Sequence, residues 1–271
     1  MLVSCLFLFS TAGHGATEWE VVNDLAIQET PLDIALSSDG KKVYVLAEKS
    51  ILIYSHENNV ITETIPLDGS YTRITASPDG EFVYLTDKSG KKISVIQLTA
   101  VYRLPVDNSP IIGKKDAPVS LVAFLDYQCP YCSRVYPLLE QILKKHSDDV
   151  KLVIKHYPLR MHRFARKASV YALAASRQNK YRELTALYLK QFKSLNAESL
   201  RSYAQEVGVD VPALEKDAKD PLIAKIMEMD VKLARDADVR GVPALFVNGR
   251  KVKVRSFDAI SQMIAKEIAK K

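Results

Sequence analysis

The sequence predicts an α/β domain with a mixed sheet and a helical insertion, preceded by a small all-β domain. Asp-Gly turns recur 40 positions apart in the first hundred residues, between short apolar strands. Farther along, the segments follow the order strand, helix, strand, helices, strand, strand and helix, with the hairpin turn at Asn248-Gly249. We therefore expect a β-repeat domain at 18–101, a linker or entry loop at 102–117, which carries Pro105, Pro110 and Gly113, and the α/β domain at 118–271.

The composition and charge are those of an ordinary globular protein. Of the 271 residues, 47% are hydrophobic and 26% are charged, and the formal net charge is +6. A nucleic-acid binder would gather this charge into one strip, interleaved with aromatic residues. Here Lys and Arg are spread along predicted helices and hairpin edges, so we expect a solvated basic surface and no nucleic-acid partner.

The first sixteen residues have the pattern of a secretory signal peptide, with an apolar core followed by small residues. The apolar run is far shorter than the ~20 residues that span a bilayer. No Lys or Arg precedes the apolar run, so a buried strand is the alternative to a signal peptide. The run continues past Cys5, which argues against a lipid anchor on that cysteine. We predict a signal peptide at 1–16 and a periplasmic or otherwise extracytoplasmic location.

Two segments of the N-terminal part repeat each other, each around an Asp-Gly turn, at Asp39-Gly40 and at Asp79-Gly80. Short antiparallel strands with a period near 40 residues are typical of β-propeller blades. The pattern S-x-D-G-x-x-V-Y-V resembles the YVTN family of β-propellers over about residues 18–100. We therefore interpret this region as two blade-like repeats.

Two blades cannot close a ring, because propellers normally need ~4–8 of them. The open sheet edges that remain tend to pair with another chain. We expect either a homodimer through the β-repeat domain or packing of its edge against the second domain. A small sheet with no function of its own is the alternative.

The motif Cys129-Pro130-Tyr131-Cys132 follows a predicted buried strand and opens a helix. Two intervening residues let both sulfurs meet within one helical turn, so that they can form or release a disulfide. The helix N-terminus offers free N–H groups and a partial positive charge, which stabilise the reactive thiolate. Pro130 suits the first helical position because it has no N–H. We expect Cys129 to be the exposed nucleophile and Cys132, one turn deeper, to resolve mixed disulfides.

A structural metal site is the first alternative for this cysteine pair. Zinc needs four ligands, typically two such pairs or one pair with two His. The sequence has no second pair, and His146, His156 and His162 do not show a known ligand spacing. We therefore expect no metal and no cofactor other than the redox-active disulfide itself. An inert buried disulfide is the second alternative, but a corner between strand and helix is a poor place to bury one.

A second element is Gly241-Val242-Pro243, directly before the predicted strand Ala244–Val247. A Pro at a strand start cannot donate a hydrogen bond to the sheet. If the peptide bond before it is cis, the backbone turns sharply and exposes the preceding carbonyl and N–H groups. Opposite the cysteine pair, that edge could bind a peptide. An ordinary trans-proline in a loop is the alternative.

The segments around both motifs resemble the DsbA-like thioredoxin-fold family, in the family's order and over about residues 103–271. The matching segments are 117–132, 156–162 and 239–250. The resemblance implies a thioredoxin core with a helical insertion and a cis peptide bond at Val242-Pro243. It also implies a protein thiol–disulfide oxidoreductase in which Cys129 is the nucleophile and Cys132 its partner.

One position departs from the family's pattern. The family often has a buried acidic residue six positions before the first Cys, where this sequence has Ala123. Such a carboxylate would assist proton transfer at the buried thiol. Asp126 is closer to the motif, but we expect it to point in another direction along the strand. The missing anion leaves thiolate formation at Cys129 unopposed, which favours an oxidising site.

Three functions fit these features. The first is an oxidase that donates its disulfide to exported proteins and is re-oxidised by a membrane redox partner, and Val242 before Pro243 resembles the oxidase members. The second is a dimeric disulfide isomerase or reductase, paired through its β-repeats. The third is a partner-binding protein with an accessory redox domain. We expect the first.

Overall fold

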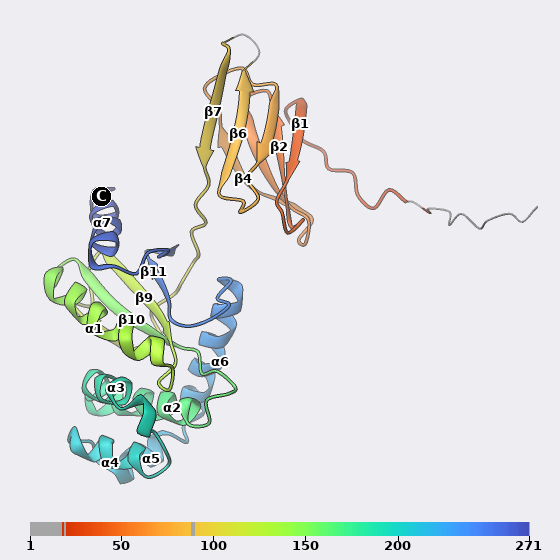
Figure 1. Ribbon diagram of the computed structural model, residues 1–271. Helices are drawn as coiled ribbons and strands as arrows, with labels where there is room; N and C mark the ends of the chain where they lie inside the picture. Colours follow the sequence, from red (N-terminus) through yellow and green to blue (C-terminus); the bar gives the residue numbers. More distant parts are fainter. Residues whose placement is uncertain (1–17, 19, 88–89, 271) are drawn as a thin grey trace, which may run out of the picture. The chain divides into compact units, whose positions relative to one another are not determined.

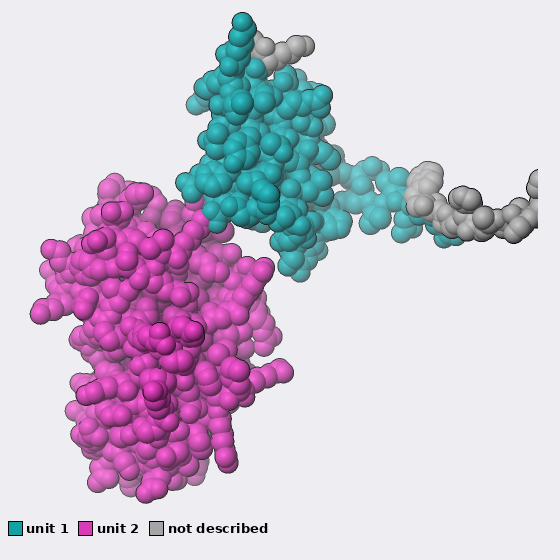
Figure 2. Space-filling view, viewed as in Figure 1, with its two compact units in different colours: residues 1–98 teal, residues 99–271 magenta. Residues whose placement is uncertain are grey.

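The computed structural model describes residues 18, 20–87 and 90–270. The predicted signal peptide at 1–16 lies outside the described residues. The chain divides into two compact units, residues 1–98 and 99–271 (Figure 2). The first is all-β and the second is α/β, which confirms the predicted fold class. Within the described residues, no helix has both the length and the apolar character needed to cross a bilayer.

The first unit consists of two antiparallel meanders, each with its strands in sequence order (Figure 1). The four strands of the first sheet are β1 (Pro31–Leu36), β2 (Lys42–Ala47), β3 (Ser50–Ser55) and β4 (Val60–Pro66). The three strands of the second sheet are β5 (Arg73–Ala76), β6 (Phe82–Asp87) and β7 (Lys92–Gln97). Buried side chains of both sheets form one core.

The same turn connects the first two strands of each sheet. Ser37 Oγ donates a hydrogen bond to Asp39 Oδ1 at 2.6 Å, and Ser77 Oγ donates to Asp79 Oδ1 at 2.5 Å. The glycine after each Asp has a left-handed φ, +67° and +68°, which favours glycine. The sequence repeat is therefore also a structural repeat, whereas its identity as propeller blades stays a prediction.

The second repeat stops one strand short of the first. Its last strand, β7, exposes Ile93 and Val95. An exposed apolar edge strand is a template for pairing with another chain. The predicted homodimer through this domain stays a prediction.

The second unit is built on a five-stranded sheet with the order β12-β11-β9-β10-β8. Its strands are β8 (Ile111–Gly113), β9 (Val119–Leu125), β10 (Val150–His156), β11 (Ala244–Val247) and β12 (Arg250–Lys251). The central strand β9 is parallel to β10 and antiparallel to β11. It is almost entirely buried because helices cover both faces.

The helices α1 (Pro130–Lys145) and α7 (Phe257–Ile268) share a core with one face of this sheet, and α6 (Pro221–Asp236) packs on the other (Figure 1). The predicted helical insertion lies between β10 and α6. Its helices are α2 (Ala165–Ala175), α3 (Tyr181–Lys190), α4 (Ser199–Glu206) and α5 (Val211–Asp217), with short 3-10 turns at Ser176–Gln178 and Phe192–Ser194.

The segment 102–117 is not the linker that we expected. It carries β8, which pairs with β10. The ring of Tyr102 packs edge-on against Phe246 at 5.7 Å, and Lys155 Nζ donates to Ser109 Oγ at 2.8 Å. The Pro and Gly content does interrupt regular structure here, but apolar side chains between these residues pack onto the sheet. The segment is therefore part of the α/β unit.

Candidate active site

Cys129 is the N-cap residue of α1. After β9 ends, a short turn leads into the helix, and Pro130 takes its first position as predicted. The carbonyl of Cys129 accepts hydrogen bonds from the N–H groups of Cys132 and Ser133, both at 3.1 Å. Cys129 therefore lies at the positive end of the helix dipole.

Both cysteines are free thiols, and both are buried. Cys129 is 4% exposed, so the expectation of an exposed nucleophile is wrong for this form. The cause is the loop at Val242, whose carbonyl oxygen lies 3.8 Å from Cys129 Sγ and accepts a hydrogen bond from it. In the same motif, Tyr131 is 61% exposed.

Cys132 is buried completely, one helical turn deeper than Cys129. The N–H of Asp126 donates to Cys132 Sγ at 3.4 Å. Burial raises the pKa of the Cys132 thiol well above its ordinary value, and the nearby Cys129 and Asp126 charges raise it further. Cys132 therefore holds its proton firmly in the reduced protein.

The structure brings the two predicted motifs together. The peptide bond between Val242 and Pro243 is cis, as the resemblance implied. Pro243 is buried at the start of β11, Val242 is half-buried, and Gly241 is exposed. The main chain of this loop reaches the sulfur of Cys129 through the Val242 carbonyl oxygen.

Sequence reasoning set Asp126 aside and did not predict the contacts of its carboxylate. This side chain is completely buried. Its Oδ1 accepts from the N–H of Gln128 at 2.7 Å, and its Oδ2 accepts from the N–H of Leu159 at 2.7 Å and lies 2.8 Å from His162 Nδ1. The hydrogen bond from the Gln128 N–H closes an Asx turn. This turn can be expected from the sequence, because an Asp at the end of a strand often accepts from the N–H two residues later. The contact with His162 has no such signal.

A buried ion pair lies elsewhere on the same sheet, and the sequence did not reveal it. Lys155 Nζ is 3.2 Å from Asp230 Oδ1, and the N–H of His156 donates to Asp230 Oδ2 at 2.8 Å. Burial raises the pKa of Asp230, while the Lys155 charge and the His156 N–H lower it. Beside the pair is a pocket of about 180 Å³ with a largely apolar lining, to which Ile226, Met229 and Leu233 contribute.

The buried surroundings of His156 favour its neutral imidazole. Burial, together with the Lys155 charge, lowers its pKa to about 3. Its ring stacks on Tyr127 at 5.8 Å, Tyr181 Oη lies 3.3 Å from its Nε2, and its Nδ1 has no hydrogen-bond partner within the described part of the chain. No three His, Cys, Asp or Glu side chains of the described residues are grouped as metal ligands would be.

The sequence model of a family described as Thioredoxin matches residues 106–266, which is more than half of the chain. The chain belongs to the thioredoxin family. The second unit is accordingly called the thioredoxin domain below. Its central motif, strand β9 followed by the cysteine pair and α1, lies within the matched region.

Solved structures agree with this assignment. BdbD from Bacillus subtilis is 21% identical with a TM-score of 0.55, and covers 63% of this chain and 98% of its own. The thiol-disulfide exchange protein alpha-DsbA2 from Wolbachia pipientis is 22% identical with a TM-score of 0.55, covering 59% and 87%. A periplasmic thioredoxin-like protein from Salmonella enterica serovar Typhimurium is 25% identical with a TM-score of 0.51, covering 60% and 91%. The predicted DsbA-like thioredoxin fold is confirmed.

Curated relatives also match the sequence. The Na(+)/H(+) antiporter NhaA 3 of Salinispora tropica is 32% identical over 146 residues, which are 54% of this chain and 22% of the antiporter. The antiporter NhaA of Herminiimonas arsenicoxydans is 30% identical over 165 residues, or 60% and 26%. The chain thus spans about a quarter of the length of the curated relatives it matches.

Proposed function

We propose that this protein is a thiol–disulfide oxidase that acts outside the cytoplasm and transfers the Cys129–Cys132 disulfide to exported proteins. The observation that carries the proposal is the 3.8 Å contact between Cys129 Sγ and the Val242 carbonyl oxygen. It puts the sulfur at the end of α1 next to main chain that can hold an extended substrate. Pro130, Tyr131, Val242 and Pro243 form the supporting surface.

The reaction begins with the oxidised pair. A substrate thiolate attacks Cys129 Sγ, the Cys129–Cys132 bond breaks, and Cys132 leaves with the electron pair and takes a proton. Burial keeps the pKa of Cys132 high, so that this proton stays. A second substrate thiolate then attacks the substrate sulfur of the mixed disulfide, and Cys129 leaves as a thiolate. Two electrons have passed from the substrate to the cysteine pair, which becomes the dithiol once Cys129 takes up a proton from water.

The electrostatics of the site favour the oxidising direction. The charge that develops on the Cys129 sulfur as it leaves faces the positive end of α1, which favours transfer of the disulfide to the substrate. The buried position six residues before Cys129 holds Ala123 and no carboxylate. The carboxylate of Asp126 is compensated by two N–H groups and by His162.

The location and the partners belong to the same proposal. The signal-like segment at 1–16 and the periplasmic structural relative support an extracytoplasmic protein. The substrates are then exported proteins with free thiols. The spent dithiol needs an oxidant, and we assign that role to a membrane redox protein that exchanges its own disulfide with Cys129 and Cys132.

The test uses the pre-oxidised chain from residue 18 onward and a synthetic peptide with two cysteines, without oxygen. Mass spectrometry follows the peptide disulfide. Wild type oxidises one peptide per active site, and Cys129→Ser oxidises none. Cys132→Ser is treated with a peptide whose single cysteine is held in an activated mixed disulfide; Cys129 displaces the activating thiol, and the reaction stops at a mixed disulfide between Cys129 and the peptide. Equal oxidation by wild type and Cys129→Ser would overturn the proposal.

A disulfide isomerase is the second candidate, favoured by the exposed apolar edge of β7. That edge could pair two copies and present two active sites. Sedimentation of the chain as a dimer, together with repair of scrambled disulfides faster than oxidation of thiols, would favour this candidate over the oxidase. The third function considered above was a partner-binding protein with an accessory redox domain. Redox activity of residues 99–271 without the β-repeat domain would argue against it.

A further inference from the structure

The charge around the active site is distributed differently from the charge of the whole chain. Residues 150–182 contain nine Lys and Arg and no Asp or Glu. Between Asp126 and Glu140, the only charged side chain is Arg134. The two segments that approach the cysteine motif are therefore purely basic, apart from the buried Asp126.

The loop after β10 is tied directly to the motif. Asp126 holds this loop through the N–H of Leu159 and through His162. The side-chain oxygen of Gln128, the residue before Cys129, accepts from the N–H of Phe164 at 2.6 Å. Arg160 and Arg163 lie between these anchor points, so that both project from the loop that borders the active site.

Four exposed arginines form what we call the basic rim. They are Arg134, Arg160, Arg163 and Arg166. Within the described residues, none of the four has a carboxylate within 4.0 Å. The arginines farther along the helical insertion differ, since Arg177, Arg182 and Arg201 each pair with Asp or Glu.

Apolar side chains accompany this charge. Met161 on the same loop is 80% exposed, and Tyr131 in the motif is 61% exposed. The guanidinium of Arg134 lies over the Tyr131 ring at 5.0 Å, and that of Arg163 lies over Phe164 at 5.3 Å. The surface therefore offers positive charge and apolar contact together, beside Cys129.

We propose that the basic rim selects polypeptide segments whose reacting cysteine is flanked by acidic residues. This inference rests on the proposed function and names its substrate class. Acidic neighbours disfavour a substrate's own thiolate, which is the attacking species, and the rim offsets that effect once the segment is bound. Before binding, the positive field draws such segments toward the site.

The experiment compares two peptides that differ only next to the reacting cysteine, with Asp and Glu in one and Lys in the other. Stopped-flow measurements give the rate constant for reduction of the oxidised full chain by each peptide. At low salt we expect the acidic peptide to react about tenfold faster than the basic one. The reason is that its carboxylates form several exposed ion pairs with the basic rim, each of modest strength. At 0.5 M NaCl the ratio should fall toward one, because salt screens exposed charges.

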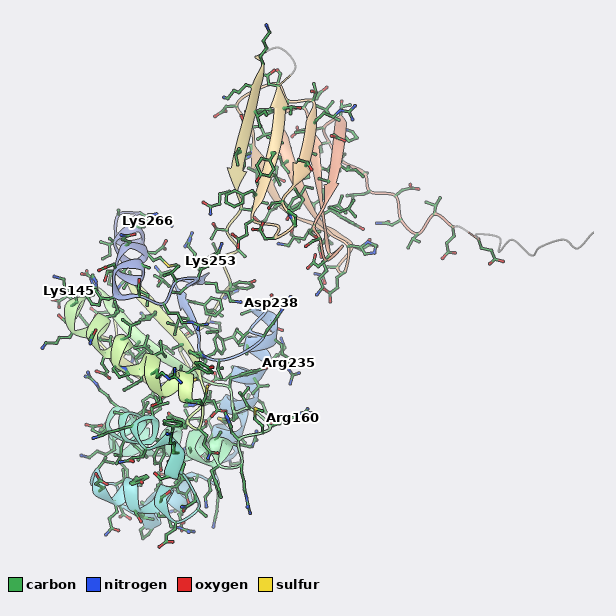
Figure 3. The ribbon with its side chains drawn as sticks, in the orientation of Figure 1. Lys145, Arg160, Arg235, Asp238, Lys253 and Lys266 are labelled. Atoms are coloured by element: carbon green, nitrogen blue, oxygen red, sulfur yellow. The ribbon has the colours of Figure 1, made fainter. Side chains whose placement is uncertain are left out.

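The charge-reversal variant Arg160→Glu/Arg163→Glu should lower this ratio to one or below. The matched control is Lys145→Glu/Lys266→Glu, which changes the same number of charges at positions that lie away from Arg160 in the thioredoxin domain (Figure 3). The control should keep the wild-type ratio. A thermal melt of each variant confirms that it is folded.

The outcomes separate this inference from the function on which it rests. If both peptides are oxidised at equal rates at low salt, the substrate class is wrong and the oxidase stands. If Arg160→Glu/Arg163→Glu keeps the wild-type ratio, the rim is not the selecting surface. If neither peptide is oxidised, the proposed function fails and the inference fails with it.

Discussion

The Nδ1 atom of His162 lies 2.8 Å from Oδ2 of Asp126, a completely buried carboxylate three residues before Cys129. The two residues come from different segments, 36 positions apart. Their contact holds the loop after β10 against the cysteine motif. It also places a negative charge near enough to Cys132 to disfavour its thiolate.

Replacing Asp126 with Asn should lower the pKa of the Cys132 thiol. Burial is the main cause of the raised pKa and is unchanged in this variant. The negative charge of Asp126, which raises the pKa further, is removed. In a Cys129→Ser background, alkylation of Cys132 by a small reagent at pH 9 should become faster. His162→Gln is the control, because it keeps the carboxylate. Slower or unchanged alkylation in Asp126→Asn would contradict this electrostatic role.

Stability should fall with acid because His156 stays neutral in the folded protein. Its pKa is lowered to about 3 by burial, while an unfolded His titrates near 6.5. Below pH 6.5 the unfolded state binds a proton that the folded state does not bind until about pH 3. The free energy of unfolding should therefore decrease over this range, by at most about 1.4 kcal/mol per pH unit from this residue.

The variant His156→Phe should reduce that slope, measured by urea unfolding at several pH values between 4.5 and 7.5. Phe retains the ring that packs on Tyr127 and cannot take up a proton. Tyr181→Phe removes the hydrogen bond to Nε2 without removing the imidazole, so it should keep the slope. An identical slope in wild type and His156→Phe would show that other groups cause the acid sensitivity.

Removing only one partner of the ion pair between Lys155 and Asp230 should lower the free energy of unfolding strongly. Asp230→Asn leaves the buried Lys155 charge without its partner, and we expect unfolding free energy to fall by about 3–5 kcal/mol. The double variant Lys155→Met/Asp230→Asn removes both charges, keeps an acceptor for the His156 N–H, and should lose clearly less. Chemical denaturation at pH 7 measures both. Equal losses in the single and double variants would mean that the charge itself is not the cause.

The docking of segment 102–117 depends on Gly249. This glycine has a φ of +80°, and a Cβ on it would lie 2.2 Å from the carbonyl oxygen of Tyr102. Gly249→Ala should therefore destabilise the thioredoxin domain by about 2 kcal/mol or more. Gly241→Ala is the matched control, since its Cβ would meet nothing within 4 Å. Equal melting temperatures for the two variants would contradict the observed packing.

Features set by neighbouring residues could be predicted from the sequence. Cys129 and Pro130 mark the start of α1 because a helix N-terminus depends on a few consecutive residues. The turn at Asn248 and Gly249 has positive φ at both positions, as its hairpin requires. The repeated Ser-x-Asp-Gly turns form identical local hydrogen bonds for the same reason.

Features that depend on distant partners could not be predicted in this way. Asp230 and His156 are joined across 74 positions, and Cys129 and Val242 across 113. One sequence carries no record of which buried groups will meet, so the ion pair was missed and the exposure of Cys129 was overestimated. Segment 102–117 was misassigned because Pro and Gly mark irregular backbone, which can be packed as firmly as a strand.

The most direct test of the account is the equilibrium between the Cys129–Cys132 pair and glutathione, measured on the purified chain from residue 18 onward. Acid quenching, thiol labelling and mass spectrometry give the oxidised fraction in each redox buffer. An oxidase should have an oxidising pair, with a potential near or above the ~−180 mV of disulfide isomerase. A value near the ~−270 mV of thioredoxin would contradict the oxidase and indicate a reductase.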